Sequence, residues 1–132
     1  MRLHLIMLAL LLTGMFPSLS YSGGLEGRAI YCLEKKITSP QARGFVFHEL
    51  QVAEYKIVGY SIKKGYVTKY DERGAIEVFW RGLQNTRVTL NRASLELRIA
   101  QLDRYQCEIS SKETINSKLQ DLINAAKKKN KI

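Results

Sequence analysis

The chain has 132 residues, of which 45% are hydrophobic and 25% are charged, a balance typical of a globular protein and not of a disordered one. Its formal net charge is +9, and it contains only two cysteines and two histidines. The length suits one domain, and so few Cys and His residues exclude a metal site built from many such ligands. We therefore predict a single folded domain without a metal or a cofactor.

Residues 1–22 have the three parts of a secretory signal peptide. Arg2 provides a positive start, residues 5–15 form an apolar run, and small residues precede Gly23. The run is shorter than the about 20 residues that cross a bilayer, which argues against an uncleaved anchor. We expect cleavage between Ser22 and Gly23, with a cut after Ser20 as the alternative. The product would be periplasmic or secreted, would lack a transmembrane segment and, without Arg2, would carry a net charge of +8.

Residues 23–109 have the pattern of an all-β domain. Alternating apolar and polar residues, rich in β-branched and aromatic side chains, predict seven or eight short strands separated by turns. The expected strands are 28–33, 44–49, 52–62, 65–71, 75–81, 87–91, 94–99 and 104–109. Gly59 is expected to mark a bend or bulge within the strand 52–62. Gly74 is expected in a hairpin turn, where it can adopt a positive φ.

Short strands at this spacing favour a mainly antiparallel meander, rolled into a barrel or folded as a sandwich. Cys32 lies in the first expected strand and Cys107 in the last. In an exported chain this pair is expected to form a disulfide, which closes a loop of about 75 residues and is worth on the order of 4 kcal/mol. A reactive thiol would need a Cys-x-x-Cys spacing or a neighbouring base. A bond between the first and last strands would sit at a closure seam, and we therefore prefer the barrel.

The composition changes at Ser110, and residues 110–132 are predicted to form an amphipathic helix with a Lys-rich tail. A Ser-x-x-Glu capping box at 110–113 predicts a helix over about 112–127. Its apolar face consists of Ile115, Leu119, Leu122, Ile123 and Ala126. We expect this face to pack against the sheet, where the helix could close the open end of the barrel. The tail ends in Lys127, Lys128, Lys129 and Lys131, a candidate contact with an anionic surface.

Residues for catalysis are few. His48 is the one histidine after the export signal, and strand alternation would place it and Glu49 on opposite faces. The adjacent carboxylates of Asp71 and Glu72 fall in an expected turn. Phosphate-loop, dinucleotide-binding, zinc-protease and nucleophile-elbow motifs do not occur in the sequence. We therefore predict that the protein is not an enzyme.

Tyrosines stand beside lysines at several places, as in Tyr55-Lys56 and Lys69-Tyr70. Such mixtures can bind single-stranded nucleic acid or sugars by stacking. The same mixture arises when tyrosines occupy the half-buried face of a strand and lysines its solvated face. Because export removes most nucleic-acid partners, we favour the second interpretation and expect no nucleic acid.

Five short motifs carry a resemblance to other proteins. They are Ala29-Ile30-Tyr31-Cys32, Gly44-Phe45-x-Phe47, Ile76-x-x-x-Trp80, Thr89-Leu90-Asn91-Arg92-x-Ser94-Leu95-x-Leu97 and Tyr105-Gln106-Cys107-Glu108. With these motifs, residues 28–109 resemble small exported proteins of marine bacteria that carry no assigned activity. The resemblance implies a bacterial source and a periplasmic destination, and it assigns no functional residue.

The most favoured function is that of a non-enzymatic periplasmic binding or interaction protein. Its positive charge favours an anionic envelope lipid, a polysaccharide or an acidic protein as the partner. One alternative is a carrier that holds an apolar small molecule inside the barrel, although small barrels are often filled by their own side chains. A second alternative is an enzyme with an unrecognised site.

Overall fold

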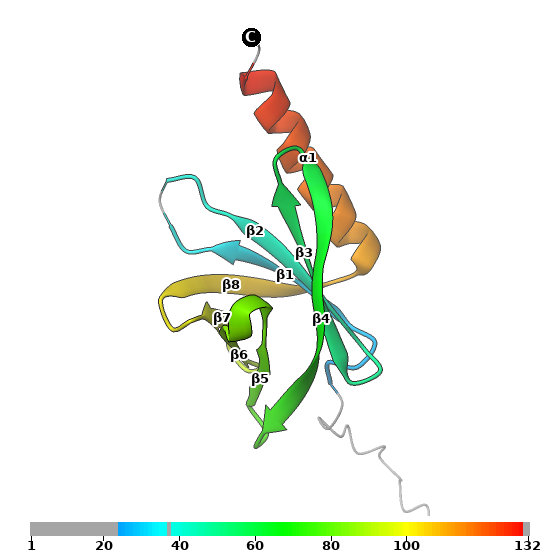
Figure 1. Ribbon diagram of the computed structural model, residues 1–132, viewed down its shortest axis with the longest axis vertical. Helices are drawn as coiled ribbons and strands as arrows, with labels where there is room; N and C mark the ends of the chain where they lie inside the picture. Colours follow the sequence, from blue (N-terminus) through cyan, green and yellow to red (C-terminus); the bar gives the residue numbers. More distant parts are fainter. Residues whose placement is uncertain (1–23, 37, 131–132) are drawn as a thin grey trace, which may run out of the picture.

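The computed structural model describes residues 24–36 and 38–130. The expected export signal, residues 1–22, and Lys131 lie outside the described residues. Eight antiparallel strands form a closed barrel in which each strand pairs with its neighbours in the sequence and β8 pairs with β1 (Figure 1). The predicted all-β class is confirmed, and the sheet forms a barrel and not a sandwich.

The elements follow one another in a simple meander. The strands are β1 (Ala29–Glu34), β2 (Ala42–His48), β3 (Gln51–Val58), β4 (Ser61–Arg73), β5 (Glu77–Arg81), β6 (Arg87–Asn91), β7 (Glu96–Ile99) and β8 (Asp103–Ser110). A short 3-10 turn, η1 (Leu83–Asn85), joins β5 to β6, and the helix α1 (Lys112–Lys129) follows β8. The predicted C-terminal helix is therefore confirmed.

The segment 52–62 is a hairpin, and the prediction of one bent strand is wrong. Gly59 adopts a φ of +64° and, with Tyr60, makes the turn between β3 and β4. Apolar residues continue on both sides of this turn, with Ile57 directly opposite Ile62, so the periodicity does not reveal the break. β4 is consequently long: its first part, up to Lys69, pairs with β3, and its end pairs with β5.

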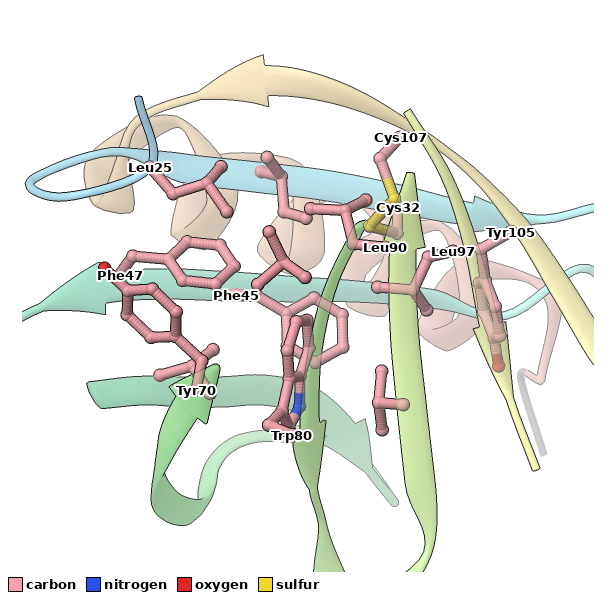
Figure 2. Close-up of a cluster of buried hydrophobic side chains, with 14 residues drawn as sticks. Leu25, Cys32, Phe45, Phe47, Tyr70, Trp80, Leu90, Leu97, Tyr105 and Cys107 are labelled. Atoms are coloured by element: carbon pink, nitrogen blue, oxygen red, sulfur yellow. A yellow bond between two sulfur atoms is a disulfide. The ribbon is translucent and has the colours of Figure 1, made fainter. Parts of the chain in front are cut away.

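Side chains fill the interior of the barrel (Figure 2). The buried cluster consists of Leu25, Ile30, Cys32, Phe45, Phe47, Val52, Tyr70, Val78, Trp80, Val88, Leu90, Leu97, Tyr105 and Cys107. The ring of Phe47 stands edge-on to Tyr70 and Trp80, with centroids 5.2 and 5.6 Å away. Leu25 belongs to the segment before β1 and extends the cluster at one end (Figure 2).

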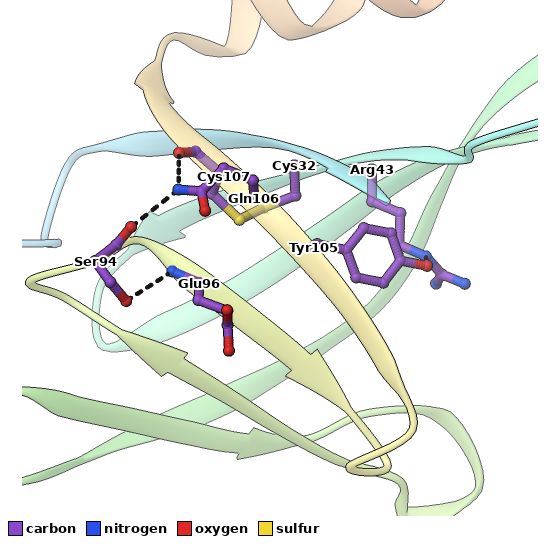
Figure 3. Close-up of a disulfide and its surroundings, with 7 residues drawn as sticks. All are labelled: Cys32, Arg43, Ser94, Glu96, Tyr105, Gln106 and Cys107. Carbon is purple, nitrogen blue, oxygen red and sulfur yellow. Dashed lines mark hydrogen bonds between the residues drawn. A yellow bond between two sulfur atoms is a disulfide. The ribbon is translucent and has the colours of Figure 1, made fainter. Parts of the chain in front are cut away.

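The two cysteines form the predicted disulfide. Cys32 on β1 lies directly opposite Cys107 on β8, with their Cα atoms 4.0 Å apart (Figure 3). Both residues are buried. The bond therefore joins the two strands whose pairing closes the barrel, as the positions of the cysteines in the sequence predicted.

The helix α1 lies against the outside of the barrel, and the expectation that it closes an open end is wrong. Ile115 and Leu119 pack on Ala29, Ala42 and Tyr55, which β1, β2 and β3 present on their outer face. Small and aromatic side chains at outward positions make this face apolar, and burying it favours docking of the helix there. The helix begins at the predicted residue, Lys112, but the predicted capping box at 110–113 is wrong, because the cap is Ser111, whose hydroxyl accepts a hydrogen bond from the Thr114 amide at 3.1 Å.

Candidate functional site

The strongest candidate site is where the β3–β4 hairpin meets the end of α1. Both project past the barrel at the same end of the molecule (Figure 1). We call this region the basic end and define it as Lys56, Val58, Tyr60, Lys63, Lys127, Lys128 and Lys129. Two segments that are more than sixty residues apart in sequence thus contribute to one surface.

The hairpin contributes two lysines that face each other. Lys56 lies directly opposite Lys63 across β3 and β4. The next pair along, Ile57 and Ile62, packs against the cluster that holds α1, so alternation directs the two lysines to the other face of the hairpin. Like charges directly opposite each other destabilise a sheet. Among the residues that the structure describes, neither lysine forms an ion pair, so no carboxylate there pairs with either ammonium group to offset the repulsion.

The helix contributes three lysines from its last turn. Lys127 places its ammonium 6.0 Å from the centre of the Tyr60 ring, and the Asn130 amide donates a hydrogen bond of 2.9 Å to the Tyr60 hydroxyl. These contacts hold the end of α1 beside the tip of the hairpin. Lys128 and Lys129 are exposed. The lysines also complement the negative end of the helix dipole, which stabilises this terminus.

Acidic residues are absent from both segments. Residues 55–70 contain four lysines and no Asp or Glu, and residues 122–130 contain three lysines and no Asp or Glu. Several basic residues elsewhere are paired with acids: Lys35 with Glu96 at 2.7 Å, and Lys118 with Glu108. The basic end therefore combines five lysines from two segments that contain no acid.

The structure brings together residues that the sequence analysis treated separately. Lys127, Lys128 and Lys129, predicted as a candidate contact, lie on the last turn of α1, whereas Lys131 is outside the described residues. Lys56 and Lys63 were not predicted as part of this site. The absence of acids from residues 55–70 was the available signal, but only the hairpin turn at Gly59 shows that the two lysines are neighbours.

A second polar cluster lies inside the barrel, where Arg43 reaches Tyr105 (Figure 3). The Arg43 guanidinium donates hydrogen bonds to the Tyr105 hydroxyl at 3.1 Å and to the Glu54 carboxylate. Burial lowers the pKa of Arg43, but Glu54 and Tyr105 outweigh that effect, and its pKa is raised overall. Burial also raises the pKa of Tyr105. Glu54 neutralises the charge of Arg43, and Tyr105 accepts a further hydrogen bond from it, so we assign this cluster a structural role.

His48 and Glu49 contact each other, contrary to the expectation from strand alternation. The His48 Nε2 lies 3.4 Å from a carboxylate oxygen of Glu49, because β2 ends at His48 and Glu49 turns away with a φ of +52°. Both side chains are about three-quarters exposed, at 74% and 79%. They border an open groove of about 330 Å³ that Lys64 and Lys112 also line. A contact so exposed to water lacks the desolvation that tunes catalytic groups.

Comparison of the chain with known protein families, with curated proteins and with solved structures finds no match. Within residues 24–36 and 38–130, no helix combines the length and the apolar character needed to cross a membrane. The disulfide is typical of proteins that fold outside the reducing cytosol. The chain's own residues are therefore the basis of the functional proposal.

Proposed function

We propose that the protein is a non-enzymatic periplasmic binding protein that attaches to an anionic component of the cell envelope through the basic end. The observation that carries this proposal is the convergence of five lysines from β3, β4 and α1 on one end of the molecule, within segments that contain no acid. Export through the signal at residues 1–22 belongs to the same proposal, and the disulfide supports it.

The like-charged pair Lys56 and Lys63 supports a binding role. A cross-strand pair of this kind opposes hairpin formation. Such a pair becomes useful when an anionic partner binds, because the partner neutralises both charges at once. Each lysine near an anionic surface adds about 1 kcal/mol, so the five together provide several kcal/mol in low salt. Screening by salt should remove most of this attraction.

Two observations favour this function over the alternatives. The barrel interior holds fourteen buried side chains, including five aromatic residues and the disulfide, where a carrier would hold its ligand. The partly buried charged groups of the Arg43 cluster are engaged with one another, and His48 is exposed at the end of β2. Neither arrangement supports a carrier of apolar molecules or an enzyme.

The test compares two triple variants of equal net charge. One changes Lys127, Lys128 and Lys129 to Gln, and the other changes Arg81, Arg98 and Arg104, which are exposed on β5, β7 and β8, to Gln. We expect the lysine variant to bind dextran sulfate and phosphatidylglycerol vesicles at least tenfold more weakly than the arginine variant. The melting temperatures of the two should be similar. Equal loss of binding in both would mean that net charge alone acts, and would reject the basic end as a site.

Export is tested separately by the intact mass of the protein from its native host. The proposal predicts a mass that begins at Gly23, or at Tyr21 for the alternative cut, and no thiol alkylation until the protein is reduced. A full-length mass with two alkylated thiols would place the protein in a reducing compartment and contradict the periplasmic assignment.

A further inference from the structure

We infer that the anionic partner is the surface of a phospholipid bilayer, into which the tip of the β3–β4 hairpin inserts Val58 and Tyr60. This inference rests on the proposed function, because it names the partner of the same basic end. It distinguishes a lipid surface from the polysaccharide and the acidic protein, which offer negative charge but no apolar layer beside it.

Val58 and Tyr60 leave apolar surface in water at the tip. Their exposed fractions are 50% and 49%. Tyrosine favours the boundary between lipid headgroups and acyl chains, because its ring is apolar and its hydroxyl is polar. Burial of Val58 in that layer would remove apolar surface from water, which a hydrated polysaccharide cannot do. The tip therefore has the chemistry of a shallow membrane anchor.

The lysines stand around this apolar tip in the arrangement that insertion requires. Lys56 and Lys63 project from the face of the hairpin opposite α1, and Lys127 lies over the Tyr60 ring on the other side. Long lysine side chains can keep their ammonium groups among the headgroup phosphates while their stems pass apolar surface. Cations on both sides of the tip could thus bind phosphates while Val58 enters the layer beneath them.

The backbone of the hairpin is also suited to this position. β3 and β4 pair up to Val58 and Ser61, directly before the turn. Backbone groups that leave water need hydrogen-bond partners, and this ladder supplies them up to the tip. Insertion would therefore bring only the unpaired backbone groups of the turn at Gly59 and Tyr60 into the interface. The tip would lie at a depth of about 5–10 Å, which is common for peripheral proteins.

Two other exposed turns of the barrel lack this combination. Leu50 is 67% exposed in the turn after β2, and Leu102 is 84% exposed in the turn before β8. Each has an acid directly beside it, Glu49 and Asp103. An anionic membrane repels these carboxylates, whereas it attracts the lysines of the basic end. Charge therefore favours the β3–β4 tip over these two turns, although the leucine in each is more exposed than Val58 or Tyr60.

The first experiment separates lipid insertion from charge attraction. The variant carrying Val58→Ser and Tyr60→Ser is compared with the variant carrying Leu50→Ser and Leu102→Ser, on phosphatidylglycerol–phosphatidylcholine vesicles and on dextran sulfate. We expect the tip variant to bind vesicles about tenfold more weakly and to lose much less of its dextran sulfate binding, where only the Tyr60 contacts to Lys127 and Asn130 are lost. The control variant should match the unaltered protein on both. Tyr60→Phe keeps the ring, and vesicle binding should persist when only the hydroxyl contact to Asn130 is lost.

The second experiment measures insertion directly. Tyr60→Trp and Leu102→Trp each add an indole to a turn, and vesicles with brominated acyl chains quench indoles that enter the apolar layer. We expect quenching for the substitution at position 60 and none at position 102. The buried Trp80 contributes the same background to both variants.

The outcomes distinguish the two proposals. Loss of vesicle binding in the lysine triple variant, without an effect of the tip variant and without quenching, would overturn the lipid inference and leave the proposed function intact. Equal weakening of the tip variant on vesicles and on dextran sulfate would also overturn the lipid inference. Equal behaviour of the lysine and arginine triple variants would reject the proposed function itself.

Discussion

The side chain of Ile115 on α1 occupies the space above Gly44 on β2 that any larger residue at that position would need. A Cβ atom at Gly44 would lie 2.3 Å from the Ile115 Cγ2 and 3.0 Å from its Cδ1. Isoleucine has one strongly preferred χ1 rotamer in a helix, so its Cγ2 cannot easily move aside. The docking of α1, and with it the position of the terminal lysines, therefore depends on a missing side chain in the sheet.

Gly44→Ala should displace the helix and destabilise the protein by about 1–3 kcal/mol, as overpacking of a buried contact usually does. Chemical denaturation followed by the emission of Trp80, the single tryptophan, would measure this change. Gly82→Ala is the matched control, because a Cβ there meets its nearest atoms at 3.8 Å. Ile115→Ala should lower the free energy of unfolding less in the Gly44→Ala variant than in the unaltered protein. Equal effects of Ile115→Ala in the two backgrounds would show that the two positions do not interact.

Replacing both Cys32 and Cys107 by Ala should lower the free energy of unfolding by about 4 kcal/mol, because the bond restricts a long loop in the unfolded chain. Alanine is chosen because both positions are buried, and a serine hydroxyl there would lack a partner. Urea denaturation of the unaltered protein and of the double variant gives the difference. Equal stability of the unaltered protein and the double variant would mean that the disulfide does not stabilise the folded barrel.

The fold should lose stability in acid through Glu26. The Tyr70 hydroxyl donates a hydrogen bond of 2.7 Å to its carboxylate, and the Leu50 amide donates another at 3.2 Å. These bonds, that of Tyr70 first, hold the pKa of Glu26 below its usual value of 4.5. The unfolded chain therefore binds this proton more readily than the folded protein does. As the pH falls from the usual pKa of a glutamate toward the lower pKa of folded Glu26, protonation of Glu26 favours the unfolded state, and the free energy of unfolding decreases.

Glu26→Gln should flatten this acid dependence, which denaturation curves from neutral pH down to about pH 3 would show. Glu96 provides the comparison, because hydrogen bonds from Lys35 and then Arg98 lower its pKa as well. Glu96→Gln should leave the Glu26 contribution in place. An acid dependence that is unchanged in Glu26→Gln would contradict a role for the Tyr70 contact.

Lys63→Glu should stabilise the hairpin and weaken binding at the same time. It would place a carboxylate opposite Lys56 and replace a repulsion with an attraction, which is worth about 0.2–1 kcal/mol. Lys69→Glu makes the same change of charge opposite Gln51, where no lysine is present to gain a partner. Only Lys63→Glu should raise the melting temperature, and it should reduce vesicle binding more than Lys69→Glu does. A fall in stability would refute the interpretation that Lys56 and Lys63 are held together against their repulsion.

Local sequence patterns were sufficient to predict several features of the fold. Alternation over residues 94–99 identified a strand that the structure places at Glu96–Ile99, and the apolar spacing from Ile115 to Ala126 identified the helix, although its cap is Ser111 and not the predicted Ser110. These features can be predicted because they depend only on residues that lie close together in the sequence. The placement of Cys32 and Cys107 in the first and last strands also pointed to the closure that the disulfide makes.

Local patterns along the chain are therefore enough to predict the β class, the terminal helix, the disulfide and an excess of lysines. The position of the helix on the outside of the barrel follows from the fold, because it depends on the absence of a side chain at Gly44 beneath Ile115. The Gly59 turn likewise decides that Lys56 faces Lys63, and docking of α1 brings Lys127 to Tyr60. Charges separated by many residues become one surface only through folding, since a linear pattern does not specify which distant segments meet.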